Sequence, residues 1–478
     1  MTSRVGFTTQ AVVQDIWTSL ALPSSALLSL SLPDSDTPLF PSTHKLSTLS
    51  QATVATSALA AAFVSSPSSV PKVIVPLRHV AAEVNSHRLY SFDAGQPPLA
   101  SSWGPIGGLY KAKDGYVRIH DNFLNHRIGA LQPLGLPHTA TKQQVAEAIS
   151  SWTKVDYETA ATGNGTGAVY ALRTRDEWNQ HPQSAAISDS PVLLKQLSHG
   201  PIPSTSPPKT SRCLEGLRVV ELSRVIAGPV AGKALAAHGA DVLWVTSPNL
   251  PSLPELDVDL SRGKRTIQLD LTNETDKQTL LDLIADADVF IQAYRPGSLS
   301  ARGFSPDALT KLNPRLIYAN MSAFGPSGPW SQRRGFDSLV QTCSGMSAGE
   351  AECAGKGEVA QMAPYQVLDH AAGYLLATGI CAAAYHRAEK GGSWLVDVSL
   401  AGAMKYLCNL GYYDADVFNL PEVYPSKDDV PADMKEQRDT GFGKMTFVKH
   451  SAEVEGKRVG WDEMPKALGS DEPKWLSR

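Results

Sequence analysis

The stretch LRVVELSRVIAGPVAGKALAAHGADVLWVT, residues 217–246, decides the fold. Its first seven residues and its last seven are apolar runs of the kind that form buried strands. Between them, residues 229–239 predict a helix that closes at Gly239. A strand, a helix and a strand in close succession predict a βαβ unit, and therefore a parallel sheet with a right-handed crossover.

The same pattern continues along the chain. Further strands are predicted at 266–271, 288–294 and 315–322, with helices at 276–287 and 306–313 between them. This alternation predicts an α/β fold with an open, doubly wound (Rossmann-like) parallel sheet. Ligands of such sheets bind at the carboxyl ends of the strands, so we expect the functional loops at 224–229, 261–266, 294–297 and 322–330.

Changes in composition divide the chain into five parts. Residues 1–100 are rich in Ala, Ser and Leu and predict a helical region, while 101–185 contain a hairpin pattern, GGLYKAKDGYVRIH (107–120), followed by helical segments. Residues 186–212 are rich in Pro, Ser and Thr and predict a linker with nothing to pack. The sheet domain is expected at 213–411 and a C-terminal extension at 412–478.

Composition excludes several classes of protein. A net charge of −4 disfavours nucleic acid or an anionic membrane as the main partner. The five cysteines show no zinc-type spacing, so no metal site is expected. The N-terminus lacks a leader pattern, and no stretch reaches the eighteen or so apolar residues of a membrane span. Cytoplasm is the expected location, with mitochondrion and peroxisome left open.

Two groups of residues are candidates for function. Arg262, Lys264 and Arg265 lie beside a predicted strand, where they suit either a phosphate group or plain solvation. Asp369 opens an apolar segment, 367–385, as either a helix N-cap or a desolvated nucleophile. Asp337 has the same two interpretations, and His370 is interpreted as structural.

The loop after the first strand offers a weaker signal. Ala227 and Gly228 open a helix, whose first amides suit an anion, although a plain strand-to-helix turn explains them equally well. The dinucleotide pattern GxGxxG is absent because Gly228 and Gly232 are four residues apart, so NAD or FAD is not expected.

An ordered series of motifs resembles the class III CoA-transferases, also called the CaiB/BaiF family, which includes formyl-CoA transferase, carnitine CoA-transferase and 2-methylacyl-CoA racemase. The resemblance rests on LEGLRVVELSRVIAGP (214–229), HGADVLWV (238–245), RGKRTIQLDL (262–271), ADVFIQAYRPGSLSARGF (287–304), PRLIYANMSAFGPSGPW (314–330), RGFDSLVQTCSG (334–345), LDHAAGYLLATGICAAAYHR (368–387) and GGSWLVDVSL (391–400).

The resemblance implies an acyl-CoA enzyme with an interlocked homodimer, no permanently bound cofactor, and acyl-CoA and a carboxylic acid as substrates. Asp369 would form an anhydride with the acyl group and then a thioester with CoA. The implied CoA contacts are Arg262, Lys264, Arg265, Ala227, Gly228, Tyr294 and Arg295.

The sequence departs from the family pattern at several places. The small domain, 101–185, precedes the sheet domain, so the domain order is rearranged, and 1–100 would be the remnant of a degenerate family half. Phe336 stands where the racemases carry a histidine, and Ile226 where formyl-CoA transferase carries a glutamine. The family's glycine loop has no clear counterpart here, and the candidates for it are Gly163, Gly165 and Gly167. A racemase or other acyl-CoA isomerase and a non-catalytic CoA-binding subunit remain alternatives to the transferase.

Overall fold

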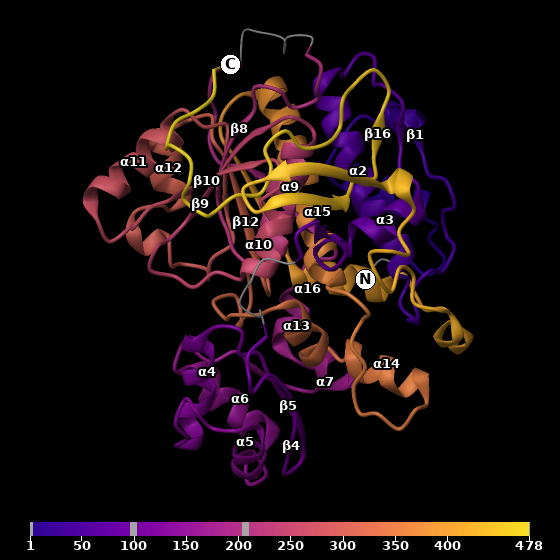
Figure 1. The fold of residues 1–478 in the computed structure, drawn as a ribbon, viewed down its shortest axis with the longest axis vertical. Coiled ribbons are helices and arrows are strands. Elements are labelled where there is room, and N and C mark those ends of the chain that lie inside the picture. The colour runs from indigo at the N-terminus through magenta and orange to yellow at the C-terminus, as the bar shows by residue number, and fades with distance from the viewer. Residues whose placement is uncertain (1–2, 96–102, 203–209, 478) are drawn as a thin grey trace.

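The computed structural model describes residues 3–95, 103–202 and 210–477, and its centre is a seven-stranded sheet (Figure 1). The strands follow the order β10 (Lys264–Gln268), β9 (Asp241–Thr246), β8 (Arg218–Leu222), β11 (Val289–Gln292), β12 (Ile317–Ser322), β13 (Trp394–Ser399) and β7 (Val192–Gln196). All neighbours pair in parallel except β13 and β7. The predicted open, doubly wound α/β fold is confirmed.

The order in which successive strands are placed in the sheet reverses between β8 and β11. Strands β8, β9 and β10 add toward one edge, and β11, β12 and β13 add toward the other. The loops after β8 and β11 therefore diverge at the carboxyl ends of these two strands. Such a switch point is where doubly wound sheets bind their ligands.

Helices cover both faces of the sheet because successive strand residues point to opposite faces. Val219 and Ile291 face the core that contains α9 (Ala227–Ala237), α10 (Pro254–Leu260) and α15 (Val367–Lys390). Val220 and Phe290 face a second core, closed by α11 (Glu274–Ala285) and α12 (Pro306–Leu312). Helix α15 thus runs through the interior, and its first residues lie near the carboxyl edge of the sheet (Figure 1).

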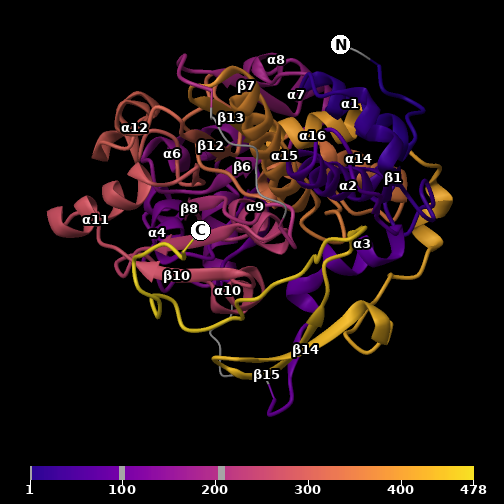
Figure 2. The same cartoon turned by 90° about the horizontal axis from the view of Figure 1, so that it is seen from above.

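The N-terminal region adds a further layer to α15. It contains α1 (Thr9–Ser19), α2 (Leu46–Ser65) and α3 (Leu77–Glu83), and α2 packs against α15 (Figure 2). By length and composition α2 and α15 could each cross a membrane, which corrects the expectation that no such stretch exists. Protein encloses 94% and 100% of their apolar windows, so their apolar surfaces form core in this structure.

The small domain has its own sheet and core. The predicted hairpin is confirmed, since β4 (Gly108–Ala112) pairs antiparallel with β5 (Gly115–Ile119), and β6 (Val169–Ala171) adds beside it. Helices α4 (Leu124–Leu131), α5 (Lys142–Ile149) and α6 (Lys154–Gly163) close this core. In Figure 1 the domain lies beneath the carboxyl edge of the large sheet.

The predicted linker is wrong for part of its length. Val192–Gln196, within 186–212, forms β7 because its side chains pack beside β13 at the sheet edge. Residues 203–209 of this segment lie outside the described residues. The linker prediction followed the Pro and Ser content and overlooked the apolar run PVLL.

The C-terminal segment covers the other edge of the large sheet. The backbone of Gly263 donates to the Glu463 carbonyl oxygen (2.8 Å), and that of Asp471 donates to the Thr266 carbonyl oxygen (3.0 Å). These bonds shield the β10 edge. The remaining elements are α7 (Arg175–Asn179), α8 (Pro182–Ala186), α13 (Asp337–Cys343), α14 (Met346–Ala354), α16 (Leu400–Asn409), β1 (Leu30–Ser31), β2 (Val73–Ile74), β3 (Ser91–Phe92), β14 (Lys435–Thr440), β15 (Gly443–Val448) and β16 (Glu453–Val454).

Candidate active site

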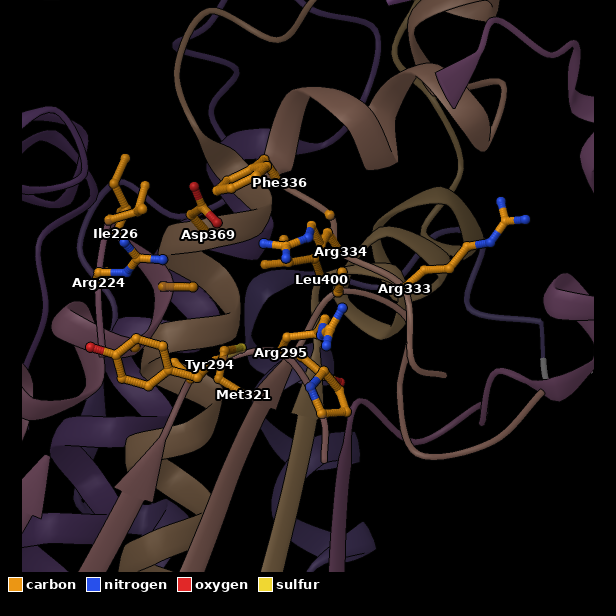
Figure 3. A pocket seen from close by; sticks show the side chains of 18 of the residues that line it. Arg224, Ile226, Tyr294, Arg295, Met321, Arg333, Arg334, Phe336, Asp369 and Leu400 are labelled. Atoms are coloured by element: carbon orange, nitrogen blue, oxygen red, sulfur yellow. The ribbon is translucent and has the colours of Figure 1, made fainter. Parts of the chain in front are cut away.

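A cavity of about 120 Å³ opens at the switch point between β8 and β11. Its walls come from the loops after these strands, from the end of β12, from the start of α15 and from the small domain. The lining residues include Phe123, His126, Arg224, Ile226, Ala227, Gly228, Tyr294, Arg295, Met321, Arg333, Arg334, Phe336, Asp369 and Leu400. Figure 3 shows the Asp369 side chain between Ile226 and Phe336.

The turn after β8 is strained and tightly packed. Val225 has φ of +70°, a left-handed conformation that is costly for a β-branched residue. At Gly228 a Cβ would lie 2.7 Å from the Cβ atoms of both Ala293 and Ser223, so only glycine lets α9 approach the sheet this closely. The first amides of α9 have no partner within the helix, and Ala227 and Gly228 line the cavity. This turn can therefore present backbone donors to an oxyanion.

Asp369 lies in the first turn of α15, and only 6% of its surface is exposed. Burial, together with the charge of Asp337, raises its pKa well above the usual value of a carboxyl. Among the described residues, none donates a hydrogen bond to its side chain. Both causes disfavour the charged form, so the carboxylate of Asp369, once ionised, is strongly basic, and no hydrogen bond among the described residues has to break before it attacks an electrophile.

The second candidate carboxylate, Asp337, has a structural contact instead. Its Oδ2 accepts the backbone N–H of Leu368 (2.7 Å) and of Asp369 (3.2 Å), and its Oδ1 accepts from the Gln341 side chain. Asp337 thus holds the N-terminus of α15 and does not line the cavity. Burial raises its pKa to about 6.

His370 points away from the cavity. Its ring stacks on that of His87 with centroids 5.7 Å apart, and burial keeps the pKa of His370 well below its usual value. The geometry agrees with a structural role for this histidine.

The small domain contributes two side chains that the sequence analysis missed, Phe123 and His126. His126 is buried and its pKa falls to about 3, so its imidazole is neutral. Its Nε2 lies 3.2 Å from Nη1 of Arg334 and accepts from it, because a guanidinium only donates. The sequence signal was present, since FLNHR (123–127) follows the predicted hairpin with two residues between them.

Phe336 also has a partner in the small domain. Its ring stacks on His120 with a centroid distance of 3.8 Å and an interplanar angle of 1°. This contact closes the cavity between the two domains with an apolar wall.

A second cavity of about 370 Å³ adjoins the first, and four arginines line it: Arg224, Arg295, Arg302 and Arg334. Three of them also line the first cavity. In the part of the chain that the structure describes, none of the four is paired with a carboxylate. Arg295 and Arg334 donate to the Gly165 carbonyl oxygen (3.1 and 2.9 Å). Gly165, one of the candidates for the family's glycine loop, therefore lies at the rim of this second cavity.

The predicted cation cluster is wrong as a phosphate site. Arg262, Lys264 and Arg265 are at most 7% exposed and line neither cavity. They pair with Asp259, Glu221 and Asp241 respectively. Because β10 begins at Lys264, the loop 261–263 precedes the strand and lies at its amino end, opposite the ligand edge.

Other predicted contacts do meet at the cavity. Ala227, Gly228, Tyr294 and Arg295 line it together with Asp369. Of the four predicted loops, 224–229 and 294–297 lie at the cavity, and the fourth, 322–330, reaches it with residues 322 and 323. No group of three or more His, Cys, Asp and Glu side chains that could hold a metal ion occurs within the described residues.

Comparisons with known proteins agree with the motif series. Residues 214–431 match the model of "CoA-transferase family III". The acetyl-coenzyme A transferase nodX of Hypoxylon pulicicidum is 32% identical over 65% of this chain and 55% of its own length. The probable fatty acyl-CoA transferase Rv3272 of Mycobacterium tuberculosis is 37% identical over 42% of this chain and 52% of its own.

Among solved structures, a CaiB/BaiF family protein from Brucella suis is 30% identical, with a TM-score of 0.38, over 41% of this chain and 55% of that one. The chain thus spans about half the length of these relatives.

Proposed function

Since residues 214–431 belong to CoA-transferase family III, we propose that the protein transfers CoA from an acyl-CoA donor to a carboxylate acceptor. Asp369 is the nucleophile in this proposal. The observation that carries it is that Asp369 is the only acidic side chain among the described residues of the cavity wall. It lies beside the α9 amides that can hold an oxyanion.

The reaction proceeds through the Asp369 carboxylate in four displacements. Its oxygen attacks the thioester carbonyl, and the C–S bond breaks to give an aspartyl anhydride and CoA thiolate. The thiolate attacks the aspartyl carbonyl and releases the donor acid, leaving an aspartyl-CoA thioester. The acceptor carboxylate displaces the thiolate to form a new anhydride, and the thiolate then takes the acceptor acyl group and frees Asp369.

The arginine-lined cavity is the proposed site of the CoA phosphates. Four guanidinium groups, which have no carboxylate partner among the described residues, create a positive field at a ligand edge of the sheet. In this role Arg224, Arg295, Arg302 and Arg334 replace the buried Arg262, Lys264 and Arg265. The pantetheine chain would then reach Asp369 past Tyr294 and Arg295, which line both cavities.

The size and lining of the first cavity favour a short, apolar acyl group. Ile226, Met321, Phe336 and Leu400 lie on its wall with Asp369. Its volume of about 120 Å³ is smaller than the roughly 150 Å³ cavity that accepts benzene in a protein core. Ile226 offers no polar contact, which disfavours formate and oxalate.

The racemase alternative needs a proton carrier facing the α-carbon. Phe336 cannot carry a proton, and the Nε2 lone pair of His126 is engaged by Arg334. The non-catalytic alternative leaves the desolvated carboxylate of Asp369, which has no hydrogen-bond donor among the described residues, without a role. The interlocked homodimer remains a separate prediction, which sedimentation at several concentrations would test.

Mass spectrometry of CoA exchange distinguishes the three functions. The full chain is incubated in deuterated buffer with a short-chain acyl-CoA and a second, isotopically labelled short carboxylate. A transferase produces the labelled acyl-CoA, a racemase introduces deuterium at the α-carbon without exchange, and a binding subunit produces neither. Absence of labelled acyl-CoA across a panel of donor and acceptor pairs would contradict the proposal.

A further inference from the structure

Arg334 lies at the junction of the two cavities, on the loop that leads from the end of β12 to α13. Its Nε donates to the Gly165 carbonyl oxygen (2.9 Å), and its Nη1 lies 3.2 Å from Nε2 of His126. Both partners belong to the small domain, so the side chain crosses the boundary between the two domains. Two contacts across this boundary therefore fix the orientation of the guanidinium.

Neither contact neutralises the charge of Arg334. The Gly165 partner is a backbone carbonyl, and burial above all lowers the pKa of His126 to about 3, so that its imidazole is neutral. Among the described residues no carboxylate pairs with Arg334. Burial and the charges of Arg295 and Arg224 lower the pKa of Arg334. An anion placed beside this guanidinium would therefore be stabilised.

Arg334 also keeps donors for such an anion. A guanidinium carries five N–H groups. Gly165 takes the one on Nε and His126 takes one on Nη1, which leaves the second N–H of Nη1 and both of Nη2. These have no acceptor within the described part of the chain. Adjacent guanidinium N–H groups match the oxygens of a carboxylate in spacing and charge.

The other arginines of the smaller cavity are directed elsewhere. Arg224 donates to a backbone carbonyl of the loop after β9 (3.2 Å), and Arg295 is exposed. Figure 3 shows Arg333 pointing away from Asp369, whereas the guanidinium of Arg334 lies toward it. Arg334 is thus the cation best placed to hold a carboxylate beside Asp369.

We propose that Arg334 binds the carboxylate of the acid exchanged at Asp369, and that His126 is its positioning residue. This inference rests on the proposed transferase function. One oxygen of the acceptor lies against Arg334 while the other attacks the carbonyl carbon of the aspartyl-CoA thioester. A C–O bond forms, the C–S bond breaks, and CoA leaves as the thiolate. The apolar wall around Asp369 receives the rest of a short monocarboxylic acid.

Steady-state kinetics with a short-chain acyl-CoA donor and labelled propionate as acceptor tests the role of Arg334. Arg334→Gln should raise the KM for propionate at least about tenfold, and more than it raises the Kd of CoA, because a charge-assisted contact is lost. The donor should still form the adduct on Asp369. Arg315→Gln, the control, removes the same charge from an exposed side chain near the amino end of β12 and should leave this KM unchanged.

Variants of His126 separate positioning from a structural role. His126→Gln keeps a neutral acceptor for Arg334 and should preserve the KM for propionate, whereas His126→Leu removes the acceptor and should raise this KM severalfold with a smaller effect on kcat. A structural role predicts a lower melting temperature and an unchanged KM in the Leu variant, which would overturn the positioning role.

The outcomes distinguish this inference from the proposed function. A wild-type protein that exchanges CoA, with a propionate KM that Arg334→Gln leaves unchanged or raises no more than the Kd of CoA, overturns the inference alone. A wild-type protein without exchange overturns the proposed function and the inference with it. Should Arg334→Gln fail to fold, Arg334→Lys decides, since it keeps the charge and loses the planar donors. An unchanged KM in that variant would also overturn the inference.

Discussion

Replacing Arg295 and Arg302 together by Gln should weaken CoA binding by about tenfold to a hundredfold. Both guanidinium groups line the larger cavity. Arg295 donates one N–H to the Gly165 carbonyl oxygen, and Arg302 donates one to the Ser298 carbonyl oxygen. Charge-assisted hydrogen bonds contribute about 1.5–3 kcal/mol each. Both side chains are exposed, so solvent screening lowers the combined loss to about 1.4–2.8 kcal/mol.

Titration calorimetry with CoA at two salt concentrations measures this effect, and Arg265→Gln is the matched control. That change removes one positive charge where the double variant removes two, and it removes it from a side chain paired with Asp241 at the amino end of β10. The double variant should bind weakly and with a smaller salt dependence, and the control should lower the melting temperature at unchanged CoA affinity. Equal loss of affinity in both proteins would refute the assignment of the phosphate site.

Three further predictions follow from the same contacts. Asp337→Asn removes the like charge beside Asp369, so the pKa of Asp369 falls and the acid limb of the pH–rate profile should move to lower pH; an unmoved limb would rule out the coupling of these carboxyls. Lys264→Met strands the buried Glu221 carboxylate and should lower the free energy of unfolding by about 3–5 kcal/mol, measured in urea, whereas Glu221→Gln with Lys264→Met should recover most of this loss. A chain that begins at Ser211 lacks β7 and α2, exposes the apolar face of α15, and should aggregate or be inactive; a soluble and fully active fragment would contradict the role given to the N-terminal half.

The sheet was predictable because its signals are local. The apolar runs at 217–223, 240–246 and 288–294 each became a strand, since a run that must be buried on both faces has few alternatives. The hairpin at 107–120 was equally clear from its alternation and its Asp114–Gly115 turn. The apolar character of 367–385 likewise predicted the buried helix that carries Asp369.

The proposed phosphate site was not predictable from cation density. Arg262, Lys264 and Arg265 are close in sequence, but each finds a carboxylate partner from a distant or neighbouring element. The four arginines of the larger cavity, which have no carboxylate partner among the described residues, come from three separate segments, and only the fold brings them together. The order of the chain already indicated the correct end, because residues 262–265 precede the strand predicted at 266–271 and the loop before a strand lies at its amino end, opposite the ligand edge.

The contribution of the small domain was predicted only in outline. The motif order indicated that 101–185 completes the site, yet it did not single out Phe123 or His126. These side chains meet Arg224 and Arg334 across the domain boundary, and no pattern within either segment encodes that contact.

The covalent state of Asp369 tests the central claim most directly. The protein is incubated with a short-chain acyl-CoA in the absence of acceptor, treated with hydroxylamine or borohydride, and digested. The peptide that contains Val367–Tyr374 should carry the trapped modification at Asp369, and Asp369→Asn should lose both the adduct and CoA exchange while keeping its CoA affinity. An unmodified Asp369 peptide in a protein that still exchanges CoA, or exchange that survives in Asp369→Asn, would contradict the account.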